Sequence, residues 1–159
     1  MDLTSIADFC SQNIPGTLFV EYAPIEWVNS DSFYDWYVTN SNLSEFPWAG
    51  AYNWLKLPLL GSSIRWKEEM VDTPDGSAFK HQIGGVIPHM RENVHAVFEE
   101  TERHRFILKI TDKNNRSWTL GTPDAPLRFS FAAENVDSSS NSYQVDFSGT
   151  SSRRARGFM

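Results

Sequence analysis

The last third of the chain, from Phe106 to Phe147, alternates between apolar and polar residues with few interruptions. Residues 112–115 interrupt the first run with Asp and Asn, whose side chains bond nearby backbone groups and favour turns. Residues 116–120 then resume the alternation, with Trp118 and Leu120 facing one way. Two period-two runs joined by a short turn predict a β-hairpin. One side of its first strand carries only apolar residues: Phe106, Leu108 and Ile110.

Two more runs follow the same rule after a break at 121–126, which contains a glycine and two prolines. Their apolar positions are Leu127, Phe129 and Phe131 in one run, and Tyr143, Val145 and Phe147 in the other. Four strands with one apolar and one polar face predict an antiparallel sheet with one buried side.

The segment before this sheet has the periodicity of a helix. Its apolar positions recur at helical spacing, while glutamates and arginines cover the other side. We therefore expect a helix over about 90–103, packed across the apolar face of the sheet because it leads directly into Phe106. The positions that define the apolar stripe are Met90, Val94, Val97, Phe98 and Thr101.

Earlier parts of the chain predict further strands. Residues 17–22 are β-branched and aromatic, and 77–86 follow a strong turn at 72–76. Residues 51–60 and 63–71 flank Gly61-Ser62 and predict a hairpin, and Gly84-Gly85 is expected to end the 77–86 strand. A short helix is expected near 4–10, with Cys10, the only cysteine, as a small buried apolar residue.

Together these elements predict an α+β fold: mainly antiparallel β-sheet, sandwich- or barrel-like, with one covering helix near 90–103. The length of 159 residues favours a single domain over 1–159. Residues 29–50 mix aromatic residues with Asn and Ser and are interpreted as a loop or insertion, pinned to the sheet by its aromatics or serving as a recognition surface. Residues 148–159 are expected to form a flexible C-terminal tail that orders against an acidic partner.

No residue pattern predicts catalysis, and we expect no enzyme activity, metal or cofactor. The four histidines are too widely spaced for a zinc signature, and neither a hydrolase elbow nor a P-loop occurs in the sequence. A net charge of −6 argues against general nucleic-acid binding, because neutralising phosphates needs clustered Lys and Arg, and we expect no sequence-specific nucleic-acid partner. No signal peptide is predicted, because the first residues include neither a basic region nor a long apolar run. No membrane span is predicted either, since no apolar run approaches about 18 residues.

Four segments, 105–115, 118–121, 126–130 and 143–150, resemble small tail-region proteins of bacteriophages and prophages, especially those of Bacteroidetes. The resemblance covers about the last third of the chain. It implies a virion structural protein, a tail, neck or connector subunit that assembles into a ring or tube in the host cytoplasm. The implied partners are copies of the same chain and neighbouring virion proteins.

Two surfaces are candidates for the subunit interfaces of such an assembly. Ring assembly uses heterologous interfaces, which loops and termini form readily. The candidates are the aromatic segment and the arginine tail: Phe33, Tyr34, Trp36, Tyr37, Trp48, Arg153, Arg154 and Arg156. The alternative function is a ligand-binding β module of the carbohydrate type, with Trp36, Tyr37, Trp48 and Tyr52 as stacking platforms.

Overall fold

A computed structural model of the chain describes residues 16–39, 45–136 and 140–158. Within these residues the fold is mainly antiparallel β-sheet with two α-helices, which confirms the predicted α+β class. The elements in chain order are β1 (Thr17–Pro24), η1 (Ile25–Trp27), α1 (Ser30–Thr39), β2 (Leu55–Leu57), η3 (Gly61–Ser63), β3 (Arg65–Thr73), β4 (Gly76–Pro88), α2 (Glu92–Thr101), β5 (Arg105–Asp112), β6 (Ser117–Leu120), β7 (Leu127–Val136), β8 (Ser140–Ser151) and β9 (Arg156–Phe158). The expected helix near 4–10, with Cys10, lies outside the described residues.

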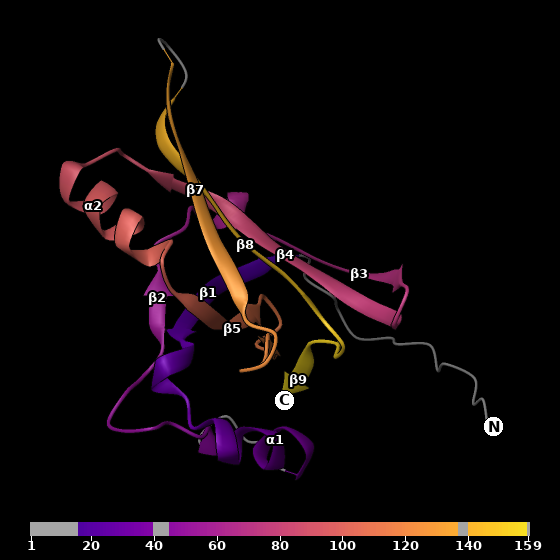
Figure 1. Cartoon of the computed structure of the whole chain (residues 1–159). Helices are drawn as coiled ribbons and strands as arrows, with labels where there is room; N and C mark the ends of the chain where they lie inside the picture. Colours follow the sequence, from indigo (N-terminus) through magenta and orange to yellow (C-terminus); the bar gives the residue numbers. More distant parts are fainter. Residues whose placement is uncertain (1–15, 40–44, 137–139, 159) are drawn as a thin grey trace.

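The strands form one branched sheet (Figure 1). Its main path runs β2-β1-β5-β7-β8-β4-β3, and the branch consists of β6, which pairs with β5, and β9, which pairs with β6. The branch begins at β5, because two strands share one of its edges. Arg105 and Phe106 pair with β7, while Leu108 to Thr111 pair with β6. The predicted hairpin of 106–111 with 116–120 is therefore present, with Ile110 opposite Trp118.

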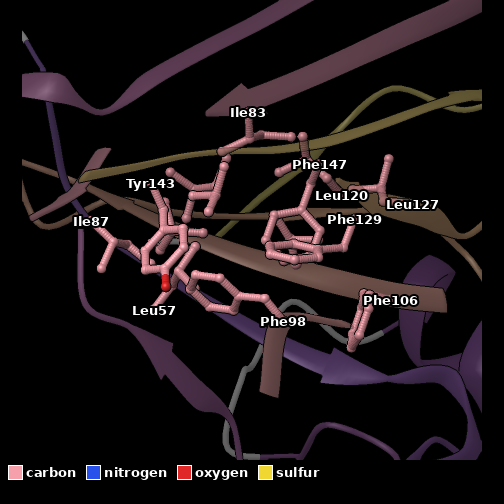
Figure 2. Packing of buried hydrophobic residues seen from close by; sticks show 14 residues of the cluster. Leu57, Ile83, Ile87, Phe98, Phe106, Leu120, Leu127, Phe129, Tyr143 and Phe147 are labelled. Atoms are coloured by element: carbon pink, nitrogen blue, oxygen red, sulfur yellow. The ribbon is translucent and has the colours of Figure 1, made fainter. Parts of the chain in front are cut away.

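Apolar side chains from most of the strands meet in one core, shown in Figure 2. The predicted inward positions of the last third supply most of it, and each of these side chains is at most 2% exposed: Phe106, Leu108, Ile110, Leu120, Leu127, Phe129, Tyr143, Val145 and Phe147. Ring contacts inside the core join strands that are not neighbours in the sheet. The ring of Phe147 on β8 lies edge-on to that of Phe106 on β5, with centroids 5.5 Å apart.

Helix α2 covers the core, as the helical periodicity predicts, but its buried face is turned from the predicted stripe. Phe98 is 6% exposed and its ring contacts Phe129 and Tyr143. Val97, expected in the stripe, is 57% exposed. The helix is rotated toward His95, whose ring packs 5.3 Å from that of Phe131. Aromatic contacts of the long β7/β8 hairpin therefore set the orientation of the helix.

Two strand predictions are wrong. The expected hairpin around Gly61-Ser62 does not form, because β2 pairs with β1 and β3 pairs with β4, with η3 between them. The chain passes there from β1 to β4: Leu57 of β2 packs in the core, and Leu60 N–H donates a hydrogen bond to Val86 O of β4 at 2.8 Å. Strand β4 also continues through Gly84-Gly85 to Pro88. Glycine at position 84 leaves room for the carboxylate of Asp146 on β8, which an added Cβ would meet, and such a Cβ would also lie 3.0 Å from the backbone oxygen of Val145.

Candidate functional site

The aromatic segment contains a helix, which corrects the expectation of a loop or insertion over 29–50. Residues Ser30–Thr39 form α1. The carboxamide oxygen of Asn29 accepts hydrogen bonds from the N–H groups of Asp31 and Ser32 at 3.1 and 3.3 Å, and this caps the helix start. The helix periodicity then places three aromatic residues on its inner face: Phe33, Trp36 and Tyr37.

These aromatics attach α1 to the outer side of the sheet. Phe33, Trp36 and Tyr37 pack with Phe46 around Ile107, which projects from β5 on the side opposite the main core. Trp48 closes this second cluster, with its ring 4.6 Å from Phe46 and 5.2 Å from Trp54. Strand β5 is consequently buried on both faces. The aromatic side chains of 29–50 thus attach this segment to the sheet, as one of the two interpretations of the sequence expected.

The C-terminal residues also differ from the expected tail. Strand β8 continues to Ser151, and Arg156–Phe158 form β9, which pairs with β6 at Ser117 to Thr119. The alternating pattern in these segments is interrupted by Gly149, Gly157 and the arginines, so the sequence did not indicate strands there. Between β8 and β9, residues 152–155 contact Glu68 on β3 and His81 on β4. We call their contacts with β3, β4 and α1 the tail junction.

Glu68 on β3 holds the tail junction through its carboxylate. One oxygen accepts a hydrogen bond from Arg154 Nη1 at 2.9 Å, and the other accepts one from Ala155 N–H at 2.7 Å. The side chain of Glu68 is only 15% exposed. Charge-assisted hydrogen bonds in such surroundings are stronger than neutral ones. Glu68 thus fixes both the backbone and one guanidinium of the tail.

His81 lies beneath the tail, opposite Glu68 in the β3–β4 register, and is 1% exposed. Its Nε2 is 3.3 Å from the carbonyl oxygen of Arg153. Its Nδ1 is 3.4 Å from Glu68 Oε2, which permits electrostatic attraction, although this nitrogen makes no well-oriented hydrogen bond. The histidine therefore links β4 to the tail from below.

Helix α1 contacts the tail from the other side. Tyr37 donates its phenolic hydrogen to Arg154 O at 2.7 Å, and the Arg153 guanidinium lies 5.4 Å from the centre of the Tyr37 ring. Arg156 lies 5.7 Å from the same ring. Burial raises the pKa of Tyr37, and the two positive charges lower it in part.

Tyr34 extends this surface by one turn of α1. Its hydroxyl donates to the carboxylate of Asp124, and Arg153 lies 5.3 Å from its ring centre. Burial and then the Asp124 hydrogen bond raise the pKa of Tyr34.

The structure brings most of the predicted site residues together, within one chain. Tyr34 and Tyr37 contact Arg153, and Tyr37 also contacts Arg154 and Arg156. Phe33 and Trp36 lie behind them at 0% and 4% exposed, whereas Trp48 belongs only to the aromatic cluster.

The sequence analysis did not identify Glu68 and His81, because Glu68 stands in the charged run 67–69 and the histidines have no ligand spacing. Strand alternation was the available signal, since it places Glu68 on the same face as the half-buried Trp66.

The described residues show neither a group of three or more potential metal ligands nor a helix that could span a membrane. The tail junction is a network of charged and aromatic side chains that fixes one segment while leaving arginine side chains at the surface. Comparisons with protein-family models, with curated proteins and with solved structures found no match.

Proposed function

We propose that the chain is a structural subunit of a bacteriophage or prophage particle, a tail, neck or connector protein that assembles into a ring or tube. Its partners are further copies of the chain and neighbouring virion proteins, and the tail junction supplies part of the subunit interface. The resemblance of the last third to phage tail-region proteins motivates the proposal.

The observation that carries the proposal is the exposed Arg153 above two tyrosine rings. Within residues 16–39, 45–136 and 140–158, no carboxylate forms an ion pair with Arg153, whereas Arg154 is paired with Glu68. The chain as a whole carries a net charge of −6. A positive, aromatic-backed surface on an acidic protein is complementary to the acidic surface of another copy, and Arg and Tyr are enriched in interfaces.

The sheet offers additional places for subunit contact. Strand β3 is the terminal strand of the main path, so one of its edges has no strand partner among the described residues. Beyond Leu127 and Arg128, β7 pairs only with β8, and Figure 1 shows the β7/β8 hairpin extending past the rest of the fold. Exposed strand edges and projecting hairpins accept strands or loops from a neighbouring chain.

Light scattering after size exclusion, combined with negative-stain electron microscopy, tests the proposal. We expect masses that are multiples of 18.2 kDa and annular particles whose abundance rises with protein concentration. A mass of 18.2 kDa at every concentration, with no particles in the micrographs, would contradict it.

A second candidate function is carbohydrate binding, for which Tyr52 is the relevant residue. Trp36 and Tyr37 are 4% and 9% exposed, so their faces are covered. Tyr52 is 44% exposed and stacks on Trp27 with centroids 4.8 Å apart and an interplanar angle of 5°. A sugar stacking there would change tryptophan fluorescence, and Tyr52→Ala would abolish the change. Glycan titrations that leave the fluorescence unchanged exclude this function.

A further inference from the structure

An apolar groove lies beside the start of β1, and none of its lining residues belongs to the tail junction. Its volume is about 620 Å³. The walls are formed by β1, by the end of β2 with the segment that follows it, and by η3 with the residue after it. The lining residues are Leu18, Phe19, Lys56, Leu57, Pro58, Leu59, Gly61 and Ile64.

The groove occupies a gap in the sheet. Strand β1 pairs with β5 from Thr17 onward, but with β2 only from Val20 to Tyr22. The edge of residues 17–19 on the β2 side therefore faces the groove. The lining residue Leu18 is 46% exposed, and Leu60, which lies between the lining residues Leu59 and Gly61, is 50% exposed. Apolar surface next to an open strand edge is typical of a place that receives another segment.

We propose that this groove is the docking site for the chain's own residues 3–14, which lie outside the described residues. This segment carries apolar residues that match the lining: Leu3, Ile6, Phe9 and Ile14. It also carries Asp8 and no basic side chain. The groove wall presents Lys56, whose ammonium lies 5.0 Å from the centre of the Phe19 ring. The charges of segment and groove are thus complementary.

The place where the segment joins the rest of the chain favours this segment, rather than another molecule, as the occupant of the groove. The segment joins the structure at Gly16, two residues before Leu18. Gly16 has a φ of +109°, a backbone conformation that favours glycine and suits a reversal of the chain. Gly16 O accepts a hydrogen bond from Lys113 N–H at 3.1 Å, which fixes this point on the β5–β6 turn. A tethered segment next to its site binds at a high effective concentration.

The single cysteine provides a direct test in the full chain. Cys10 belongs to the segment, and Gly61 lines the groove at an exposed position where an added Cβ would meet no atom within 4 Å. We would introduce Gly61→Cys and follow disulfide formation with Cys10 by non-reducing electrophoresis and intact mass. The matched control is Ser130→Cys, at an exposed position of β7. A disulfide requires Cα atoms within about 7 Å, so its rate reports proximity.

We expect an intrachain disulfide in Gly61→Cys that forms at least about tenfold faster than in Ser130→Cys, because docking raises the effective thiol concentration. Phe9→Asp should return the rate to that of the control. Equal rates in the two cysteine variants would overturn the proposal, and so would a product containing two chains, which would indicate exchange of the segment between copies. The assay does not depend on assembly through the tail junction, so either proposal can fail alone.

Discussion

The hydroxyl of Tyr37 on α1 donates a hydrogen bond to the carbonyl oxygen of Arg154 at 2.7 Å, across 117 positions of sequence. This contact joins the two segments whose composition suggested interaction surfaces. The aromatic helix and the arginine tail thus form one surface, with Glu68 and His81 beneath it.

The Tyr37→Phe variant tests the contribution of that hydrogen bond. The phenyl ring keeps its packing against Phe33, while Arg154 O loses its donor. We expect a loss of about 1 kcal/mol in the free energy of unfolding, measured by urea denaturation. The control is Tyr52→Phe, whose side chain is exposed. A Tyr37→Phe protein as stable as the wild type would show that the bond contributes nothing to the junction.

Two neighbouring glutamates on β3 allow a comparison between a residue of the tail junction and an ordinary surface residue. Glu68→Gln removes the charge that binds Arg154 and the Ala155 N–H, and should release the tail. We expect about 2 kcal/mol of destabilisation and faster tryptic cleavage after Arg153, Arg154 and Arg156. Glu69→Gln loses only an exposed ion pair with Lys67 at 3.2 Å and should change stability by less than about 1 kcal/mol. Equal cleavage rates in the two variants would argue against the role of Glu68.

Asp146 predicts a specific dependence of stability on pH. Burial raises the pKa of Asp146, and Arg65 lowers it in part. A raised pKa means that the folded protein holds this proton more tightly than the unfolded chain does, so the contribution to stability is present at low pH and is lost as the pH rises through the folded pKa. Asp146→Asn should therefore raise Tm at pH 7 and have a smaller effect near pH 3. Thermal denaturation of both proteins across this range checks the sign; a lower Tm for Asp146→Asn at pH 7 would contradict it.

Adjacent residues of α2 test how the helix is anchored. Phe98 is 6% exposed among Phe129, Phe131 and Tyr143, and Phe98→Ala should cost about 3–5 kcal/mol. Val97 is 57% exposed, and Val97→Ala should lie within about 0.5 kcal/mol of the wild type. Urea denaturation measures both. A larger cost at position 97 than at position 98 would mean that the helix is rotated from the orientation described.

The sheet was predictable where alternation is uninterrupted. In the runs at 127–131 and 143–147 the apolar positions are more buried than the polar positions between them, in the expected phase. In the run at 106–111 the expected positions Phe106, Leu108 and Ile110 are buried, but so are Ile107 and Thr111. The sequence did not reveal that β5 is buried on both faces, because Ile107 is a single apolar residue on the polar side of its run. Helix α1 was missed because its aromatic residues are common in strands and loops, and only the Asn29 cap and the 33, 36, 37 spacing indicate a helix.

The candidate site was predictable in its members but not in its arrangement. Composition identified the tyrosines and the arginines, yet their contact depends on how β8 continues past Ser148 and where β9 pairs. The end of β8 and the partner of β9 are set by tertiary contacts, because these segments contain glycines and charged residues and show no alternating pattern. Glu68 and His81 depend on the β3–β4 register, which a sequence of mixed charges does not specify.

Sedimentation velocity of Arg153→Glu against the wild type and Lys80→Glu tests the central claim, which is assembly through the tail junction. Lys80 is an exposed residue on β4, so Lys80→Glu makes the same change of charge outside the junction. We predict concentration-dependent oligomers for the wild type and Lys80→Glu, and a shift to the 18.2 kDa species for Arg153→Glu. Oligomers that are equally abundant in all three proteins, or monomers throughout, would contradict the claim.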